Sequence, residues 1–176
     1  DLAKVAFVEG TTSLGTVSLI NGTASLSRTL GTGTHYITAR YNGDANYNAL
    51  PVQTQTITVQ KASTTTSVIS SNLITTVGTQ VTFTATVTPT PTGGTIEYRD
   101  GGVTIAGCGA KALGDSCQTT LTGTGAAHSI TAVYSGTADY SGSTSPAISQ
   151  TVNAASTTTS LTATPSTLLL GQAPAI

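Results

Sequence analysis

Few side chains in this sequence could do chemistry. Among its 176 residues are two cysteines, two histidines and seven acidic residues. Cys108 and Cys117 could pair or bind a metal, and His35 and His128 could act as bases. Catalysis needs a nucleophile or base with an orienting partner, and two Cys with no nearby His cannot complete a tetrahedral metal site. We therefore expect no catalytic residue, no cofactor and no metal, and we expect that the protein is not an enzyme.

Charge and composition exclude further classes of function. Charged residues make up 7% of the chain, against about 25% in a typical soluble domain. The formal net charge of −1 provides no basic surface for the phosphates of a nucleic acid. Apolar runs are all far shorter than the roughly 20 residues that cross a bilayer. We expect no nucleic-acid partner and no membrane insertion in this segment.

The sequence repeats itself. The segment from His35 to Tyr47 returns 93 residues later as His128 to Tyr140, and the run Ser63-Thr-Thr-Thr-Ser67 returns at the same distance. Before Leu121 the distance is 91 residues, because the Gly-rich loop that follows is two residues longer. Self-similarity at a fixed distance indicates a tandem array. We predict the C-terminal part of one repeat at 1–62, a complete repeat at 63–155 and the N-terminal start of a third at 156–176.

Each repeat is built from segments that alternate apolar residues with threonine. Val81, Phe83, Ala85 and Val87 alternate with Thr in one such segment, which places one face in a core and the other in water. Clusters of Gly and Pro separate the segments. Half-buried strands of this kind favour antiparallel pairing in a sandwich. The predicted fold class is all-β, with tandem immunoglobulin-like antiparallel β-sandwiches.

One motif carries a family resemblance. The run Gly-Thr-His-Tyr-Ile-Thr-Ala-Arg-Tyr-Asn-Gly-Asp-Ala-Asn-Tyr47, preceded by Gly-Thr-Val17 and Asn-Gly-Thr-Ala24, resembles the bacterial Ig-like domain repeat family. The resemblance implies tandem repeats of a large secreted or surface bacterial protein, which serve as stalks, spacers or adhesin segments. The second copy departs from the motif at Thr137, where the first has Asp44.

The position of the two cysteines predicts that they pair. Asn21-Gly22 between alternating segments is a strong signal for a two-residue hairpin, in which Val17 would face Leu26. The equivalents of these two residues at a distance of 91 are Cys108 and Cys117. A non-hydrogen-bonded cross-strand pair has Cα atoms about 4.5 Å apart, within disulfide range. We predict a Cys108–Cys117 disulfide that staples a looser hairpin. Free buried thiols remain an alternative, and a stable disulfide implies an oxidising compartment.

The histidines and carboxylates allow alternative interpretations. His35 and His128 begin a segment after a Gly-containing loop in both copies, which favours a structural role, and no carboxylate is expected to recur with them. Asp44, Asp139 and Glu9 could supply oxygen ligands for Ca²⁺ between domains, but they are sparse. Asp44 in Asn-Gly-Asp is more simply a turn former.

Recurring tyrosines could mark a sugar-binding surface. Tyr41 and Tyr134 recur at equivalent places, as do Tyr47 and Tyr140, but packing in the core is the more usual role of such residues. The run Asn21-Gly-Thr23 matches a glycosylation acceptor, which the hairpin turn already explains.

Repeated units in which we expect no catalytic residue indicate an architectural role. We predict a structural repeat in the stalk or shaft of an extracellular or bacterial cell-surface protein or filament. The alternative is an adhesin or accessory module that binds carbohydrate or host protein through its loops. The expected partners are neighbouring repeats of the same chain. The segment 156–176 could also complete residues 1–62 of another copy by strand addition and so build a fibre, although a piece of a longer covalent array explains the same ends.

Overall fold

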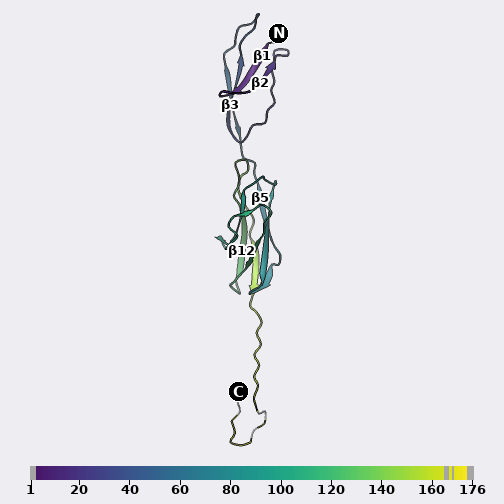
Figure 1. The fold of residues 1–176 in the computed structure, drawn as a ribbon, viewed down its shortest axis with the longest axis vertical. Helices are drawn as coiled ribbons and strands as arrows, with labels where there is room; N and C mark the ends of the chain where they lie inside the picture. The colour runs from purple at the N-terminus through teal and green to yellow at the C-terminus, as the bar shows by residue number, and fades with distance from the viewer. Residues whose placement is uncertain (1–2, 165–166, 168, 174–176) are drawn as a thin grey trace.

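The chain forms two β units that lie end to end along its longest axis (Figure 1). The computed structural model describes residues 3–164, 167 and 169–173, which contain strands and no helix. We call residues 3–60 the N-terminal unit, residues 61–63 the connection, residues 64–153 the central unit, and the residues from 154 to 173 the C-terminal segment. The predicted all-β, antiparallel fold class is confirmed. The residues that the structure describes include no helix that is long and apolar enough to cross a membrane.

The central unit is a sandwich of two sheets. One sheet has the strand order β10-β8-β12-β14-β6, with β9 paired to β8 and β13 paired to β12, and the other has the order β11-β7-β5. All of these pairs are antiparallel except β14 with β6. The strands are β5 (Thr65–Ser70), β6 (Ile74–Thr76), β7 (Gln80–Thr88), β8 (Thr95–Asp100), β9 (Val103–Thr104), β10 (Lys111–Ala112), β11 (Cys117–Thr120), β12 (Ala127–Tyr134), β13 (Ser143–Thr144) and β14 (Ile148–Asn153).

Alternation along the strands decides which side chains enter the core. In β7 all four predicted inward residues are buried, and the threonines between them lie at or near the surface. The same alternation buries Ile96 and Tyr98 of β8, and Ile130, Ala132 and Tyr134 of β12. Each large apolar side chain buried in this way contributes about 1.5–3 kcal/mol relative to exposure.

The N-terminal unit consists of a single sheet within the described residues. Its strands are β1 (Lys4–Glu9), β2 (Thr12–Ser18), β3 (Gly33–Tyr41) and β4 (Gln53–Val59), in the order β2-β1-β3-β4. At distances of 91 and then 93 residues, β1, β3 and β4 correspond to β8, β12 and β14. The sheet that β5, β7 and β11 form in the central unit has no counterpart here. As a result, Phe7 is only half-buried, whereas the equivalent Tyr98 is buried.

The Asn21-Gly22 turn forms, but the hairpin expected around it does not. Both residues have positive φ, 51° and 78°, as a type I′ turn requires, and Ile20 bridges Thr23. The predicted Val17–Leu26 pair is wrong, because Val17 pairs with Val5 across β1 and β2. In the central unit the equivalent of Leu26, Cys117, begins β11, which pairs with β7. Pairing with a more distant strand thus replaces the local hairpin beyond its first residue pair, Ile20 with Thr23.

A short segment joins the two units. Ala62 forms an isolated parallel bridge with Tyr140: its N–H donates to the Asp139 carbonyl (2.8 Å), and its carbonyl accepts from the Ser141 N–H (2.9 Å). The Lys61 ammonium donates to the Thr137 carbonyl (2.7 Å). The connection is therefore bound to the loop at 137–141 through its backbone.

Candidate functional site

The structure joins Cys108 and Cys117 in a disulfide, with Cα atoms 5.5 Å apart. Cys108 lies beside β8, where its carbonyl accepts from the Tyr98 N–H (3.0 Å), and Cys117 pairs with Phe83 of β7. The hairpin register predicted that the two cysteines would be cross-strand neighbours. This part of the prediction is wrong, although the disulfide itself is present. Because β8 and β7 belong to different sheets, the bond links the two layers of the sandwich. Both cysteines are buried in the core.

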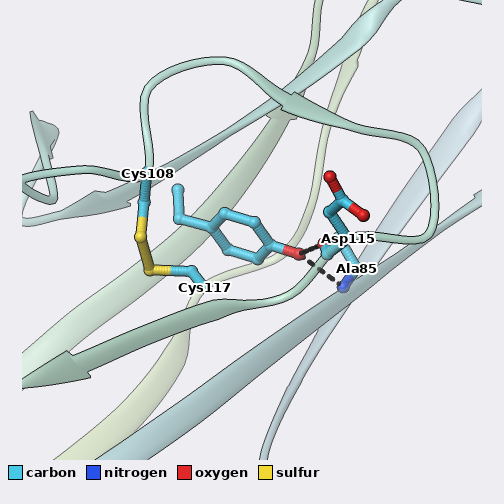
Figure 2. Close-up of a disulfide and its surroundings, with 5 residues drawn as sticks. Ala85, Cys108, Asp115 and Cys117 are labelled. Atoms are coloured by element: carbon cyan, nitrogen blue, oxygen red, sulfur yellow. Dashed lines mark hydrogen bonds between the residues drawn. A yellow bond between two sulfur atoms is a disulfide. The ribbon is translucent and has the colours of Figure 1, made fainter.

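A tyrosine hydroxyl completes the hydrogen bonding around the disulfide (Figure 2). The buried Tyr98 donates its hydroxyl to the Asp115 carbonyl and accepts from the Ala85 N–H, both at 3.0 Å. The β11–β7 register, continued past Cys117, would place Asp115 opposite Ala85. The hydroxyl thus occupies the position where a direct backbone bond would otherwise form, and ties the disulfide loop to both sheets.

We expect Tyr98→Phe to destabilise the central unit by about 1–3 kcal/mol, because the buried Ala85 N–H loses its acceptor. Chemical denaturation measures this loss. Tyr36→Phe, on an exposed ring, serves as the matched control and should change stability little. Equal stability of Tyr98→Phe and the wild type would contradict this role of the hydroxyl. The N-terminal unit has Phe7 at the equivalent position and no cysteines, so the hydroxyl and the disulfide occur together.

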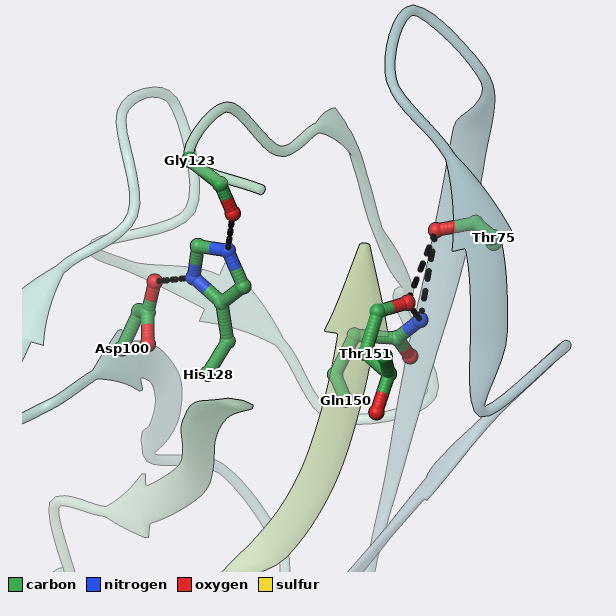
Figure 3. A network of polar contacts seen from close by, with 6 residues as sticks. All are labelled: Thr75, Asp100, Gly123, His128, Gln150 and Thr151. Atoms are coloured by element: carbon green, nitrogen blue, oxygen red, sulfur yellow. Dashed lines mark hydrogen bonds and ion pairs between the residues drawn. The ribbon is translucent and has the colours of Figure 1, made fainter. Parts of the chain in front are cut away.

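Both histidines are held by a carboxylate, contrary to expectation. Figure 3 shows the contacts of His128. The His128 Nδ1 lies 2.5 Å from Asp100 Oδ2, and its Nε2 lies 3.2 Å from the Gly123 carbonyl. In the N-terminal unit, His35 makes the same contacts with Glu9 and Gly31, both at 2.8 Å. The prediction that no carboxylate recurs is wrong. Glu9 and Asp100 are 91 residues apart, but they differ in type and precede the length change, which hid the match.

The contacts of His35 are suited to the imidazolium form. A carboxylate and a carbonyl only accept, so both ring nitrogens must donate, which a neutral ring cannot do. For His35, the Gly31 carbonyl and then Glu9 raise the pKa above its ordinary value of 6.5. Each ring ties the Gly-rich loop before its strand to the end of the preceding paired strand.

We expect the N-terminal unit to lose stability as pH rises through the raised pKa of His35. A folded-state pKa above the unfolded value stabilises fully below about 6.5, and the contribution is lost above the folded pKa. NMR titration of the ring should give a midpoint above 6.5, and Glu9→Gln should lower it. The melting temperature of the wild type should fall between pH 6 and pH 8. A midpoint of 6.5 or below in the wild type would refute this prediction.

The turn at Asp44 has an equivalent in the central unit, where a threonine takes the place of the aspartate. The Asp44 carboxylate accepts from the backbone N–H groups of Asn46 and Tyr47, and from the Tyr41 hydroxyl. The Asn46 N–H and the Tyr41 hydroxyl hold the pKa of Asp44 below its usual value. In the central unit the hydroxyl of Thr137 accepts from the two equivalent N–H groups. Thr137 therefore replaces the turn-forming role of the aspartate.

The three carboxylates considered as calcium ligands each have another partner. Asp44 binds its own turn, Glu9 binds His35, and Asp139 Oδ1 accepts from the Thr32 hydroxyl across the junction (2.7 Å). Within the ranges that the structure describes, no three His, Cys, Asp or Glu residues are grouped closely enough to hold a metal ion.

The recurring tyrosines are not grouped on one surface. Tyr134 is buried, with its hydroxyl donating to the Gly93 carbonyl (3.0 Å), and Tyr140 packs against the core. Tyr41 is half-buried, and only Tyr47 is largely exposed.

Sequence reasoning did not predict the buried polar residues, of which Gln150 is the largest. Gln150 of β14 is fully buried and accepts from the Ser70 hydroxyl of β5 (2.7 Å). Its amide nitrogen lies 3.4 Å from the Thr75 hydroxyl of β6 and from the Thr151 carbonyl (Figure 3). The signal was an amide at a position that the alternation of β14 places inside. The equivalent residue in the N-terminal unit is Ile57.

In the central unit, two mainly antiparallel layers around one core, with a disulfide between the layers, define an immunoglobulin-like β module of a structural or binding kind. A model of the family "Bacterial Ig-like domain (group 3)" matches the chain twice, over residues 3–60 and 65–153. The chain belongs to this family, as the sequence motif indicated. A comparison with curated proteins finds no match.

Two solved structures are similar over most of the chain. The ectodomain of mouse nectin-like molecule 4 (Ig1–Ig3) is 15% identical, with a TM-score of 0.40 over 90% of this chain and 57% of that one. The fibronectin(III)-like modules of Clostridium thermocellum CbhA are 14% identical, with a TM-score of 0.37 over 87% and 78%. The chain thus spans little more than half the length of the mouse ectodomain.

Proposed function

We propose that the chain is a structural part of the stalk or shaft of a bacterial extracellular or cell-surface protein, without catalytic activity. Membership of the bacterial Ig-like family and the buried disulfide support this location, because disulfides persist in oxidising compartments. A shaft must hold its units in a line, which makes the junction between units the decisive feature.

The junction is the observation that carries the proposal. Two backbone hydrogen bonds hold Ala62 to residues 139 and 141, so the connection does not act as a free linker. Lys61 and Thr32 add two side-chain bonds, both 2.7 Å long, to the same loop of the central unit. Contacts on both the linker and the preceding loop oppose bending in more than one direction. The two units therefore lie in line (Figure 1).

Small-angle scattering at low protein concentration tests this proposal. The wild type should scatter as an elongated particle with a narrow range of shapes. Ala62→Pro removes the donor to the Asp139 carbonyl and should broaden that range, whereas Ala138→Ser, in the same loop, serves as a control. A compact wild-type particle, or one as flexible as Ala62→Pro, would contradict the proposed stalk.

A further inference from the structure

The contacts of His35 lie beside the junction of the two units. We call His35 with Glu9 and the Gly31 carbonyl the His35 clasp. The residue after Gly31, Thr32, donates its hydroxyl to Asp139 Oδ1 of the central unit (2.7 Å). Within the described residues, this is the only hydrogen bond that joins the two units without passing through the connection. A change at Gly31 therefore reaches the junction within one residue.

Asp139 is a fixed partner for Thr32. Its carbonyl accepts from the Ala62 N–H (2.8 Å), and its own N–H donates to the Thr137 hydroxyl (3.3 Å). The backbone of Asp139 is thus tied to the connection and to its own turn. Whether the Thr32 bond forms depends on the loop that carries Thr32, which the clasp holds through Gly31.

The protonation state of His35 decides whether the ring holds this loop. The imidazolium donates from Nδ1 to Glu9 and from Nε2 to the Gly31 carbonyl, each over 2.8 Å. A neutral ring has a single proton. The Glu9 carboxylate keeps that proton on Nδ1, because hydrogen bonds to an ionised acceptor are roughly twice as strong as neutral ones. Nε2 then presents a lone pair to the carbonyl oxygen, and the contact with Gly31 becomes repulsive.

Glu9 is the charged group that acts on the ring. It lies on β1, which pairs with β3 on one side. On the other side, β4 places Ile57 opposite His35 and carries no titratable side chain. In the described part of the chain, the charged residues of β3, the preceding loop, the connection and the facing loop form no hydrogen bond or ion pair with the ring: Arg40, Arg28, Lys61 and Asp139.

The sign of the pH effect follows from these contacts. The Gly31 carbonyl and then Glu9 raise the pKa of His35 above 6.5. The clasp is therefore closed at low pH, where both ring nitrogens donate. It opens as the pH rises through the raised pKa, when the proton on Nε2 passes to the solvent.

The equivalent histidine of the central unit forms the same clasp. His128 contacts Asp100 and the Gly123 carbonyl (Figure 3). The side chains of both histidines are 15% exposed, so the ring of His35 is as enclosed as that of a histidine in a unit with two sheets. His128 lies at the start of β12, whereas the loop at 137–141 follows the end of that strand. Titration of His128 therefore acts at the far end of the central unit.

We propose that His35 is a pH-sensitive switch for the junction: loss of its Nε2 proton releases the Gly31 carbonyl, separates Thr32 from Asp139 and lets the two units bend. The shaft is stiff under mildly acidic conditions and more flexible under alkaline ones. This inference rests on the proposed stalk, because it names the regulation of the junction that carries that proposal.

Small-angle scattering of the 176-residue chain at about pH 5.5 and about pH 8.5 tests the switch. Both values lie above the usual titration range of carboxyl groups and on either side of that of histidine. We expect a narrow range of shapes at the lower pH. At the higher pH the range should be as broad as that of Thr32→Val, which lacks the hydroxyl and should be broad at both values.

Glu9→Gln separates the switch from a general effect of pH. The amide can donate to Nδ1, so that a neutral ring keeps its proton on Nε2 and still holds Gly31. We expect a narrow range of shapes at both pH values for this variant. His35→Phe cannot hold Gly31 and should give a broad range at both. His128→Gln is the matched control, and it should keep the pH dependence of the wild type.

NMR follows the same change on both sides of the junction. The N–H resonances of Thr32 and Asp139 should shift with the midpoint of the His35 ring, and the Asp139 shift should disappear in Thr32→Val. Equally narrow shapes of the wild type at both pH values, or a pH effect that survives in Glu9→Gln, would overturn the inference and leave the stalk proposal intact. A compact or flexible wild type at both values would overturn both.

Discussion

Replacing Cys108 and Cys117 with alanine is expected to lower the free energy of unfolding of the central unit by about 3 kcal/mol. The disulfide closes a loop with a sequence separation of 9, and the loss of that constraint on the unfolded chain is worth about 2.5 kcal/mol. The remainder comes from the core, where both cysteines are buried between the two sheets. For a unit of this size, the melting temperature should fall by roughly 10–20 °C.

A second double variant separates the covalent bond from the packing. Cys108→Val with Cys117→Leu introduces the apolar residues that the N-terminal unit has at the equivalent positions, Val17 and Leu26. This variant should be more stable than the alanine pair and less stable than the wild type. A reductant should lower the melting temperature of the wild type only. Identical melting temperatures of the wild type and the alanine pair would show that the bond adds no stability.

Gly136→Ala should destabilise the central unit by about 3 kcal/mol or more. Gly136 has a φ of 77°, which costs another residue about 1 kcal/mol or more. A Cβ there would also lie 2.7 Å from the Gly142 nitrogen and 2.8 Å from the Tyr140 carbonyl oxygen. These are backbone atoms of the loop that binds the junction, so they cannot move aside without disturbing it. Thermal unfolding followed by circular dichroism measures the loss.

Gly78→Ala is the matched control for Gly136→Ala. Gly78 has a similar φ of 85°, but a Cβ there has no atom within 4 Å. Only the conformational cost should remain, about 1 kcal/mol. Equal losses for the two variants would mean that the loop at 136–142 yields to the added methyl group. Gly43, the equivalent of Gly136 in the N-terminal unit, is as crowded, with backbone atoms at 2.7 Å.

The histidine pairs show how far sequence comparison can reach. Glu9 and Asp100 occupy equivalent positions at 91 residues, and His35 and His128 at 93. The change in distance lies in the loop that each ring holds. At a single repeat distance, each histidine and its carboxylate therefore do not recur together. Antiparallel pairing of β1 with β3, and of β8 with β12, brings the two side chains together in the fold.

What the sequence determined by itself was local. The alternation in β7 and the positive-φ turn at Asn21-Gly22 depend on neighbouring residues, and the 93-residue period is visible by comparing the sequence with itself. The core and the family follow from these patterns. Tertiary structure decided the long-range partners. The segment that begins at Cys117 pairs with β7, more than thirty positions earlier, rather than with its neighbour across the turn. The disulfide therefore connects two sheets, because a strand's partner is chosen by competition among all available edges, and that competition leaves no mark in the local pattern.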